Sequence, residues 1–347
     1  MSVLRYVSNN LGGGARIHVY QLNRALESAG IETKTFIPYY KSKDLYTDQD
    51  CVEFEYSNFF GFFDIFLYLL KNRKKIDLLH SHLKQADVFL FVLSLLFKID
   101  HVITIHYPYK SKDSKYLVLA FHRYAIKHAK KVIFISEYVK SEILKNYSIK
   151  SLDNDLVIYN ASDSTHSKRA SFEKMKICLV GELTRRKGFE DFTKLIEGLH
   201  NAGLSYELNI YGEGEFESVV RAYEADAKYN VKYHGYVMDH DEIYSNNNII
   251  LSLSHGEAFG RTVTEGMAAG LVPVLRNDGA FPELVCNLDS GFLFSDIDSL
   301  IEFLSVKSND LSFFEFLSVQ AKLRYKNKFS LVRFDEQVIA LFSEVLL

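Results

Sequence analysis

Two glutamates carry the strongest chemical signal in the sequence. Glu257 and Glu265, with seven residues between them, lie in the stretch Ser254–Gly270 (SHGEAFGRTVTEGMAAG), which separates two apolar runs. This order predicts a strand, a loop, a helix that begins near Thr262 and a further strand. The first amides of such a helix form an anion site, and a carboxylate can accept two hydrogen bonds from a vicinal diol. Alone, each glutamate is typical of an ordinary loop or helix; together they predict a site for an anion beside a sugar or ribose.

Three adjacent cations form a second candidate site. Arg185, Arg186 and Lys187 belong to the stretch Gly181–Gly188 (GELTRRKG), which follows the apolar run Lys176–Val180 and precedes an amphipathic stretch. The cations therefore lie on a predicted strand-to-helix turn, where they suit a diphosphate. A solvated basic loop is the alternative interpretation, and it is the commoner one for an isolated basic run.

Glycines and a histidine mark the first half of the chain. Leu11–Val19 (LGGGARIHV) follows an apolar strand, and its glycines, with Gly13 and Gly14 as our candidates, let the backbone approach a ligand closely. The stretch contains neither the G-x-G-x-x-G pattern of dinucleotide binding nor a P-loop. His106 ends the run Val102–His106, at the carboxyl end of a predicted strand, where ligands of parallel sheets bind.

The elements that must position these residues alternate between strand and helix. With 347 residues, the chain is longer than one hydrophobic core usually supports. Strand-like runs occur at Val3–Val7, Thr33–Ile37, Leu78–Ser81, Val102–His106 and Val132–Ser136, with a helical stretch at Ile17–Ser28, and again at Lys176–Gly181, Glu207–Tyr211, Val231–His234, Ile249–Leu253 and Val272–Leu275. This alternation predicts an α/β protein with two doubly wound parallel sheets facing a central cleft. We place the domains at residues 1–165 and 166–328, joined by the polar run Asn160–Ser171, with a C-terminal helix at residues 329–347.

Composition excludes several classes of function. The formal net charge of −3 excludes the strongly basic surface that is typical of nucleic-acid binding. The three cysteines, Cys51, Cys178 and Cys286, are far apart and lack metal-ligand spacing, which predicts reduced and mostly buried thiols. Asp239 and Asp241 lie in a polar turn before a helix, so we reject a metal site there and expect no metal. The sequence shows no signal peptide and no apolar run of the ~20 residues that a membrane span needs, which predicts a cytoplasmic protein.

These motifs resemble those of retaining glycosyltransferases of the GT-B fold, in particular glycosyltransferase family 4, also called glycosyltransferase group 1. Glu257 and Glu265 match the family's E-x7-E motif, and Leu11–Val19 matches its G-G-A-x-x-H-V segment. Gly181–Gly188 is similar to the family's G-R-L-x-x-x-K-G turn, except that Glu182 stands where the family has arginine. The resemblance implies two Rossmann-like domains, one on the acceptor side and one that binds the donor, and a C-terminal helix that crosses back onto the first.

The resemblance also implies a role for each candidate residue. Glu265 would hold the nucleotide ribose, Glu257 would contact the donor sugar, and His106 would contact that sugar near the reacting centre. Lys187 would bind the departing phosphate, with one of the two neighbouring arginines supplying the second positive charge. The further positions expected at the donor are Gly13, Gly14, Arg185, Arg186, Gly212, Val237, Phe259, Gly260, Arg261 and Thr262.

The implied activity is transfer of a hexose, with retention, from a UDP- or GDP-linked donor to a glycan or lipid-linked glycan acceptor. The setting would be bacterial surface polysaccharide or lipopolysaccharide synthesis, with no cofactor and no metal. A nucleotide-sugar epimerase of the GT-B type, which needs no acceptor, is the rival enzyme. A catalytically weak sugar-nucleotide-binding subunit is the third hypothesis, and Glu182 favours it.

Two stretches of the first half raise the hypothesis of contact with the inner face of a membrane. Phe59–Phe63 (FFGFF) is aromatic, and Lys71–Lys75 (KNRKK) is basic. Such segments can bind at a lipid surface. A core-facing aromatic stripe and a solvated charge run are the alternative interpretations.

Overall fold

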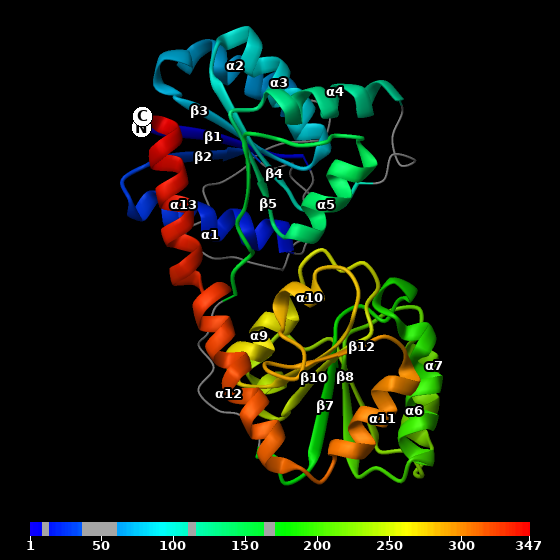
Figure 1. The fold of residues 1–347 in the computed structure, drawn as a ribbon. Coiled ribbons are helices and arrows are strands. Elements are labelled where there is room, and N and C mark those ends of the chain that lie inside the picture. Colours follow the sequence, from blue (N-terminus) through cyan, green and yellow to red (C-terminus); the bar gives the residue numbers. More distant parts are fainter. Residues whose placement is uncertain (9–13, 37–60, 110–115, 163–170) are drawn as a thin grey trace. The chain divides into compact units, whose positions relative to one another are not determined.

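The chain forms two compact units, each built on its own sheet (Figure 1). The computed structural model describes residues 1–8, 14–36, 61–109, 116–162 and 171–347. Unit one comprises Met1–Asn160 and Phe334–Leu347, and unit two comprises Ala161–Arg333. The domain boundary that we predict after residue 165 lies outside the described residues.

Unit one contains a six-stranded parallel sheet in the order β2-β1-β3-β4-β5-β6. Its strands are β1 (Ser2–Val7), β2 (Glu32–Phe36), β3 (Leu78–His82), β4 (Asp100–Ile105), β5 (Lys131–Phe134) and β6 (Asp155–Val157). Its helices are α1 (Gly14–Ser28), α2 (Gly61–Asn72), α3 (Lys84–Phe97), α4 (Tyr116–His128), α5 (Glu137–Asn146) and most of α13 (Leu331–Leu346). Every residue of β1 and β3 is buried, as expected for central strands that are covered on both faces.

Helices cover both faces of this sheet. Leu4 and Leu79 of the sheet pack with Ile65 of α2 and Leu90 of α3 in one apolar core. On the opposite face, the ring of His80 lies 5.2 Å from that of Phe342 in α13. In Figure 1, α2, α3 and α4 lie together along one side of the sheet. The sheet is therefore a two-sided scaffold whose strand ends present loops at one edge.

Unit two repeats the plan with the strand order β12-β11-β10-β7-β8-β9, again all parallel. Its strands are β7 (Met175–Val180), β8 (Tyr206–Tyr211), β9 (Val231–Gly235), β10 (Ile249–Ser252), β11 (Val272–Arg276) and β12 (Phe292–Phe294). Its helices are α6 (Phe192–Asn201), α7 (Glu217–Ala225), α8 (His240–Ser245), α9 (Arg261–Ala269), α10 (Phe281–Leu284), α11 (Ile297–Lys307) and α12 (Leu311–Lys328). Aliphatic and aromatic side chains of the sheet and of α6, α11 and α12 form its core.

The predicted two-sheet α/β fold is confirmed, and the structure adds two short edge strands. β6 and β12 contain three residues each, too few for an alternating or continuous apolar pattern to be recognised in the sequence. The helix expected near Thr262 begins at Arg261. Among the helices that the structure describes, none combines the length and the apolar character needed to cross a membrane.

The cysteines agree with the expectation only in part. Cys178 is buried in β7, and burial raises the pKa of its thiol. Cys286 is a free and exposed thiol, contrary to the prediction of burial, because it lies in the turn between α10 and β12. Cys51 lies outside the described residues.

Candidate functional site

In unit two, the turns that follow neighbouring strands approach so closely that glycine is required. Gly188 has φ +77°, and a Cβ added there would overlap the carbonyl oxygen of Leu253. Gly212 has φ +134°, and a Cβ there would overlap the carbonyl oxygen of Gly181. Val237, in the turn after β9, packs partly buried against the core residues around Tyr244. Backbone packing thus holds the turns after β7, β8 and β10 together. Gly212 lies beside the turn Gly181–Gly188, which carries Arg185, Arg186 and Lys187 and is called the cationic turn below.

Lys187 is fastened to Glu257, which joins the two chemically strongest motifs. The Lys187 Nζ atom lies 2.6 Å from Glu257 Oε2, and both side chains are largely buried. The His255 amide donates a hydrogen bond of 3.0 Å to the carbonyl of Arg186, which ties the same two loops through their backbones. A charged pair of this length is held firmly because both partners are shielded from water.

The two arginines of the cationic turn differ in their surroundings. Arg186 Nη1 lies 3.9 Å from Glu257 Oε2, and its Nη2 lies 3.7 Å from Glu182 Oε2. The exposed Glu182 carboxylate therefore faces a guanidinium. Arg185 is exposed, and its amide donates a hydrogen bond of 3.0 Å to Glu215 Oε1. Of the two, Arg186 is the one that the structure brings towards Glu257.

Gly260 sets the start of α9. It is the N-cap residue with φ 99° and ψ 60°, in the left-handed region that favours glycine, and a Cβ there would meet Phe281 Cε1 at 2.8 Å. Phe259 is buried, with its ring 5.9 Å from that of Phe329 in an edge arrangement. The side chains around this turn thus anchor it, while the backbone of the first helical turn remains the part that can meet an anion.

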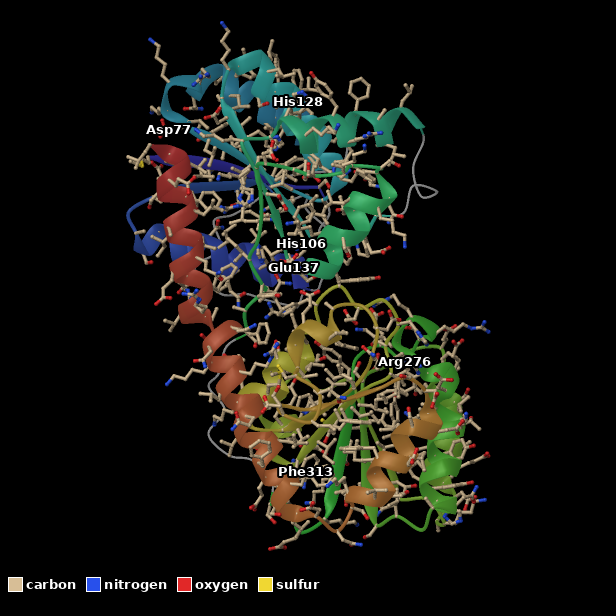
Figure 2. All side chains as sticks on the ribbon, in the orientation of Figure 1. Asp77, His106, His128, Glu137, Arg276 and Phe313 are labelled. Atoms are coloured by element: carbon tan, nitrogen blue, oxygen red, sulfur yellow. The ribbon has the colours of Figure 1, made fainter. Side chains whose placement is uncertain are left out.

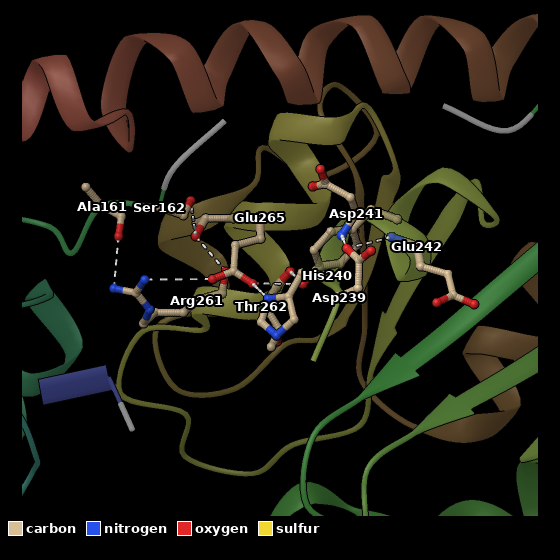
Figure 3. A network of polar contacts seen from close by, with 11 residues as sticks. Ala161, Ser162, Asp239, His240, Asp241, Glu242, Arg261, Thr262 and Glu265 are labelled. Carbon is tan, nitrogen blue, oxygen red and sulfur yellow. Dashed lines mark hydrogen bonds and ion pairs between the residues drawn. The ribbon is translucent and has the colours of Figure 1, made fainter. Parts of the chain in front are cut away.

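Glu265 lies inside a polar network instead of on an open surface (Figure 3). Its Oε2 atom accepts a hydrogen bond of 2.9 Å from the Tyr244 hydroxyl and lies 3.1 Å from His240 Nδ1. Arg261 Nη2 lies 3.8 Å from Oε1 and also donates through Nη1 to the carbonyl of Ala161 at 3.0 Å. Burial alone would raise the pKa of the Glu265 carboxyl, but the hydrogen bond from His240 and the charge of Arg261 outweigh it, so the pKa is lowered. The carboxylate is thus ionised and held in one orientation.

His240 and Tyr244 are partners that the sequence reasoning did not assign. They lie four positions apart on α8, on the same side of the helix, and the hydroxyl of Tyr244 also donates to the carbonyl of Thr262 at 3.2 Å. The hydrogen bond with Glu265 raises the pKa of His240. A polar pair spaced four apart is not distinctive in a sequence, so only the fold shows this network.

Asp239 serves α8 as its N-cap (Figure 3). Its side chain accepts hydrogen bonds from the amides of Asp241, at 2.9 Å, and Glu242, at 3.4 Å. The carboxylate is therefore engaged by the helix end, as capping residues are.

In unit one, His106 belongs to a cluster of buried histidines. It directly follows β4, and its Nε2 atom lies 2.9 Å from His82 Nδ1, with which it shares a hydrogen bond. The ring of His18, in α1, lies 4.9 Å from that of His106, and His18 Nδ1 lies 2.8 Å from Asn160 Oδ1. Figure 2 labels His106 within this unit. Gly14 is the first residue of α1, and Gly13 lies outside the described residues.

Burial keeps His82 and His106 neutral. It lowers the pKa of His106 to about 3, and burial, reinforced by repulsion between His82 and the imidazoles of His80 and His106 when they are protonated, lowers that of His82 well below the ordinary value. One nitrogen from each of His18, His82 and His106 lies within 4.8 Å of the others, and neutral imidazoles can ligate a metal ion. In this structure, however, the nitrogens of His82 and His106 bond to each other. The three rings are buried, and our expectation of no metal stays a prediction.

Two family models match the chain in succession. The model described as Glycosyltransferase Family 4 matches residues 12–165, and the model described as Glycosyl transferases group 1 matches residues 162–302. Together they span almost all of the motifs described above.

Curated relatives and solved structures resemble the chain over long stretches. An uncharacterized 41.2 kDa protein in the cps region of Klebsiella pneumoniae is 25% identical over 332 residues, covering 88% of this chain and 89% of the relative. The capsular polysaccharide biosynthesis glycosyltransferase CapM of Staphylococcus aureus is 24% identical over 241 residues, 63% of each chain. Among solved structures, Anabaena HepE in complex with UDP has a TM-score of 0.78 at 16% identity, covering 99% of this chain and 100% of that one. A glycosyltransferase from Rickettsia africae has a TM-score of 0.80 at 17% identity, covering 99% and 98%.

Proposed function

The chain belongs to the group 1 and family 4 glycosyltransferases and has the GT-B fold. We propose that it transfers a hexosyl group from a UDP- or GDP-linked donor to a glycan or lipid-linked glycan acceptor. The transfer retains the anomeric configuration. UDP is the first choice of donor base, because HepE, which has the same fold, is described in complex with UDP. The names of the relatives from Staphylococcus and Klebsiella support capsular polysaccharide synthesis as the setting.

One observation carries the donor part of this proposal. The cationic turn and the loop before α9 meet through the 2.6 Å pair between Lys187 and Glu257. This contact ties an ammonium group to the loop that leads into α9 at Gly260, and the start of a helix favours an anion. Lys187, with Arg186 beside it, is therefore assigned to the diphosphate of the donor, and Glu257 holds the ammonium in place and contacts the donor sugar.

Glu265 is assigned to the ribose of the nucleotide. Its carboxylate is ionised and fixed by Tyr244 and His240, so it loses little freedom when it accepts hydrogen bonds from a diol. A carboxylate has about four acceptor positions, and the contacts with these two residues fall on one of its two oxygens. The network thus orients the glutamate and leaves acceptor positions of its carboxylate for a ligand.

The transfer step follows from these roles. The bond between the anomeric carbon and the diphosphate oxygen breaks, the acceptor hydroxyl oxygen bonds to the same face of that carbon, and the hydroxyl proton passes to a leaving-phosphate oxygen. The products are a glycoside and a nucleoside diphosphate. Lys187 stabilises the negative charge that grows on the diphosphate, an effect worth about 10²- to 10³-fold in rate for one well-placed donor. His106, neutral and buried, bonds a hydroxyl of the donor sugar and needs no proton transfer of its own.

The test is a thermal-shift panel with UDP, GDP, ADP and their common sugar conjugates, on the wild type and on Glu265→Ala. A ligand at a hundred times its dissociation constant stabilises the protein by about 2.7 kcal/mol. We expect one base to stabilise the wild type and Glu265→Ala to lose most of that shift. Absence of a shift with every nucleotide would overturn the donor assignment.

Product analysis then separates the transferase from its rivals. A purified acceptor glycan with the stabilising donor should yield a glycoside and the nucleoside diphosphate. An altered donor sugar without any acceptor would indicate an epimerase. Tight donor binding with no turnover in either assay would indicate a binding subunit, the hypothesis that Glu182 raised.

A further inference from the structure

The segment that follows β11 is hydrogen-bonded to the backbone of the loop that carries Glu257. The amide of Gly256 donates a hydrogen bond of 3.0 Å to Asp278 Oδ2, and the amide of Ala280 donates one of 2.8 Å to the carbonyl of Glu257. The other carboxylate oxygen, Asp278 Oδ1, accepts from the amide of Gly279 at 2.6 Å. One carboxylate therefore joins the two chain segments through their backbone amides.

The same two segments pack against each other without room for a side chain between them. Gly279 has φ +62°, and a Cβ added there would lie 2.5 Å from the amide nitrogen and 2.6 Å from the carbonyl oxygen of Glu257. At the far end of the loop, a Cβ on Gly260 would meet Phe281 Cε1 at 2.8 Å. Residues 278–284 thus contact the loop at both of its ends.

This supporting segment is itself fixed to the rest of unit two. Arg324, in α12, donates hydrogen bonds of 2.9 Å and 2.6 Å to the carbonyls of Glu283 and Leu284. Arg276, the last residue of β11, is buried and donates to the carbonyl of Leu253 at 2.9 Å, directly after β10. Both ends of the segment are therefore anchored, and the carboxylate between them has a fixed support.

The position of the loop decides where two charged groups lie. Glu257 Oε2 accepts from Lys187 Nζ at 2.6 Å, and the amide of His255 donates to the carbonyl of Arg186. His255 Nδ1 also lies 3.5 Å from Asp278 Oδ2. A shift of the loop backbone would therefore move Glu257 and the ammonium group that it holds. Such a shift is costly for catalysis, because charge stabilisation at a reacting centre depends on fixed geometry.

We propose that Asp278 is a positioning residue for the transfer reaction: through the Gly256 amide it sets the place of Glu257 and, through Glu257, that of Lys187. The inference rests on the proposed function, which gives Glu257 and Lys187 their roles at the donor. A carboxylate suits this task because it accepts from backbone amides more strongly than a neutral side chain does, and it can bond two of them at once. Asp278 acts through the loop backbone and needs no contact with donor or acceptor.

The experiment compares Asp278→Ala and Asp278→Asn with the wild type, using UDP and UDP-glucose, or the corresponding pair for the base that the thermal-shift panel selects. Asp278→Ala should lower the affinity for the sugar conjugate about tenfold, the effect of losing one hydrogen bond to a charged group. The affinity for UDP should change much less, because Glu265 still holds the ribose. The kcat for transfer should fall about tenfold to a hundredfold.

Two further variants of this segment sharpen the test. Asp278→Asn keeps one side-chain oxygen that can accept from the Gly256 amide, so it should recover most of the affinity and of kcat. Gly279→Ala crowds the Glu257 peptide from the same side, so it should reproduce the selective loss of affinity for the sugar conjugate. Equal weakening of UDP and UDP-glucose binding by Asp278→Ala would overturn the positioning role, as would a loss in Asp278→Asn as large as that in Asp278→Ala.

Asp310 provides the matched control. Its side chain is 40% exposed, against 42% for Asp278, and it accepts a hydrogen bond of 3.1 Å from the amide of Phe313 in the first turn of α12. Figure 2 shows Phe313 well apart from Arg276, which ends β11. Asp310→Ala should lower the stability of unit two by a similar amount and leave kcat and both affinities unchanged. The same selective loss in Asp310→Ala would overturn the inference.

Hydrogen exchange of the unliganded protein separates this inference from the donor assignment. The peptide that contains the Gly256 amide should lose protection in Asp278→Ala and keep it in Asp278→Asn, whether or not a nucleotide binds. Lost protection with unchanged affinity for UDP-glucose and unchanged kcat would overturn the positioning role and leave the donor assignment intact. Absence of nucleotide binding in the wild type would instead overturn the donor assignment itself.

Discussion

The polar centres of the two units are built on opposite electrostatic principles. In unit one, His106 is buried against the rings of His18 and His82, and burial lowers its pKa to about 3. In unit two, Lys187 pairs with Glu257, and the buried Glu265 stays ionised because its neighbours outweigh its desolvation. One centre keeps its groups neutral, and the other keeps its charges paired. The neutral centre matches the role that we propose at the hydroxyl groups of the donor sugar, and the charged one matches the role that we propose at the diphosphate.

The largest expected effect is on the charged centre. Lys187→Ala should lower kcat by about 10²- to 10³-fold, because it removes the cation that we assign to the leaving diphosphate in the proposed function. Lys194→Ala is the matched control, since that lysine pairs with Asp298 at 2.7 Å on the exposed surface of the same unit. Steady-state kinetics on both variants checks this. An equal loss in the two variants, or a full rate for Lys187→Ala, would remove the contrast between the units.

The next largest effect is acid sensitivity of two buried histidines in unit one, His101 at the start of β4 and His106 in the histidine cluster. Each of these histidines has a pKa of 6.5 in the unfolded chain and about 3 in the folded protein. Between those pH values the unfolded chain binds more protons than the folded protein. The contribution of the histidine to the free energy of unfolding is therefore full above pH 6.5 and is lost as pH falls. His101 and His106 should each contribute a loss of about 2 kcal/mol by pH 5.

Hydrogen exchange detected by mass spectrometry can follow each unit separately. Intrinsic fluorescence cannot, because the chain contains 22 tyrosines and no tryptophan. Amides of β3 and β4 should lose protection between pH 7 and pH 5, after correction for intrinsic exchange, more than those of β7 and β10. The amides around Glu265 should keep their protection over this pH range. The pKa of the Glu265 carboxyl is lowered, so its contribution to the free energy of unfolding persists until pH falls below the ordinary carboxyl range. Equal loss in both units would break the comparison.

A smaller effect should follow from Tyr244→Phe. The change removes the donor to Glu265 and to the carbonyl of Thr262, which should cost about 1–2 kcal/mol of stability. It should also weaken binding of the nucleotide, because the glutamate loses a group that orients it. Tyr223→Phe removes a hydroxyl that donates to Glu197 at 3.2 Å on the exposed surface, and it should change neither quantity measurably. Denaturant unfolding and calorimetric titration with UDP measure the two effects.

The smallest effect concerns the exposed charges of the cationic turn. Arg186→Ala should change stability by less than about 1 kcal/mol, because its contacts with Glu182 and Glu257 are long and solvated. Affinity for UDP should fall about tenfold. Glu182→Arg in that background should restore most of the affinity, because it returns a cation to the same turn. Unchanged affinity in Arg186→Ala would assign the second positive charge to Arg185 instead.

The sequence predicted best those features of the candidate site that depend on residues close together along the chain. The glycines of the strand-to-helix turns, the cations before Gly188 and the start of α9 are local patterns, and the structure has them where the sequence predicts them. Glu265 illustrates the limit. Its position on α9 was predictable, but its bonds to Tyr244 and His240 come from a helix more than twenty positions earlier in the chain.

The sequence by itself indicated the alternation of strands and helices in both units, the resemblance to the family and several of the polar residues at the strand ends. These follow from apolar periodicity, turn residues and short motifs, all of which are local. Tertiary structure alone decided that Lys187 meets Glu257 seventy positions away, and that His82 and His106 are buried side by side, where burial lowers the pKa of both. Pairing and desolvation depend on which distant segments come together, and no spacing along the chain records that.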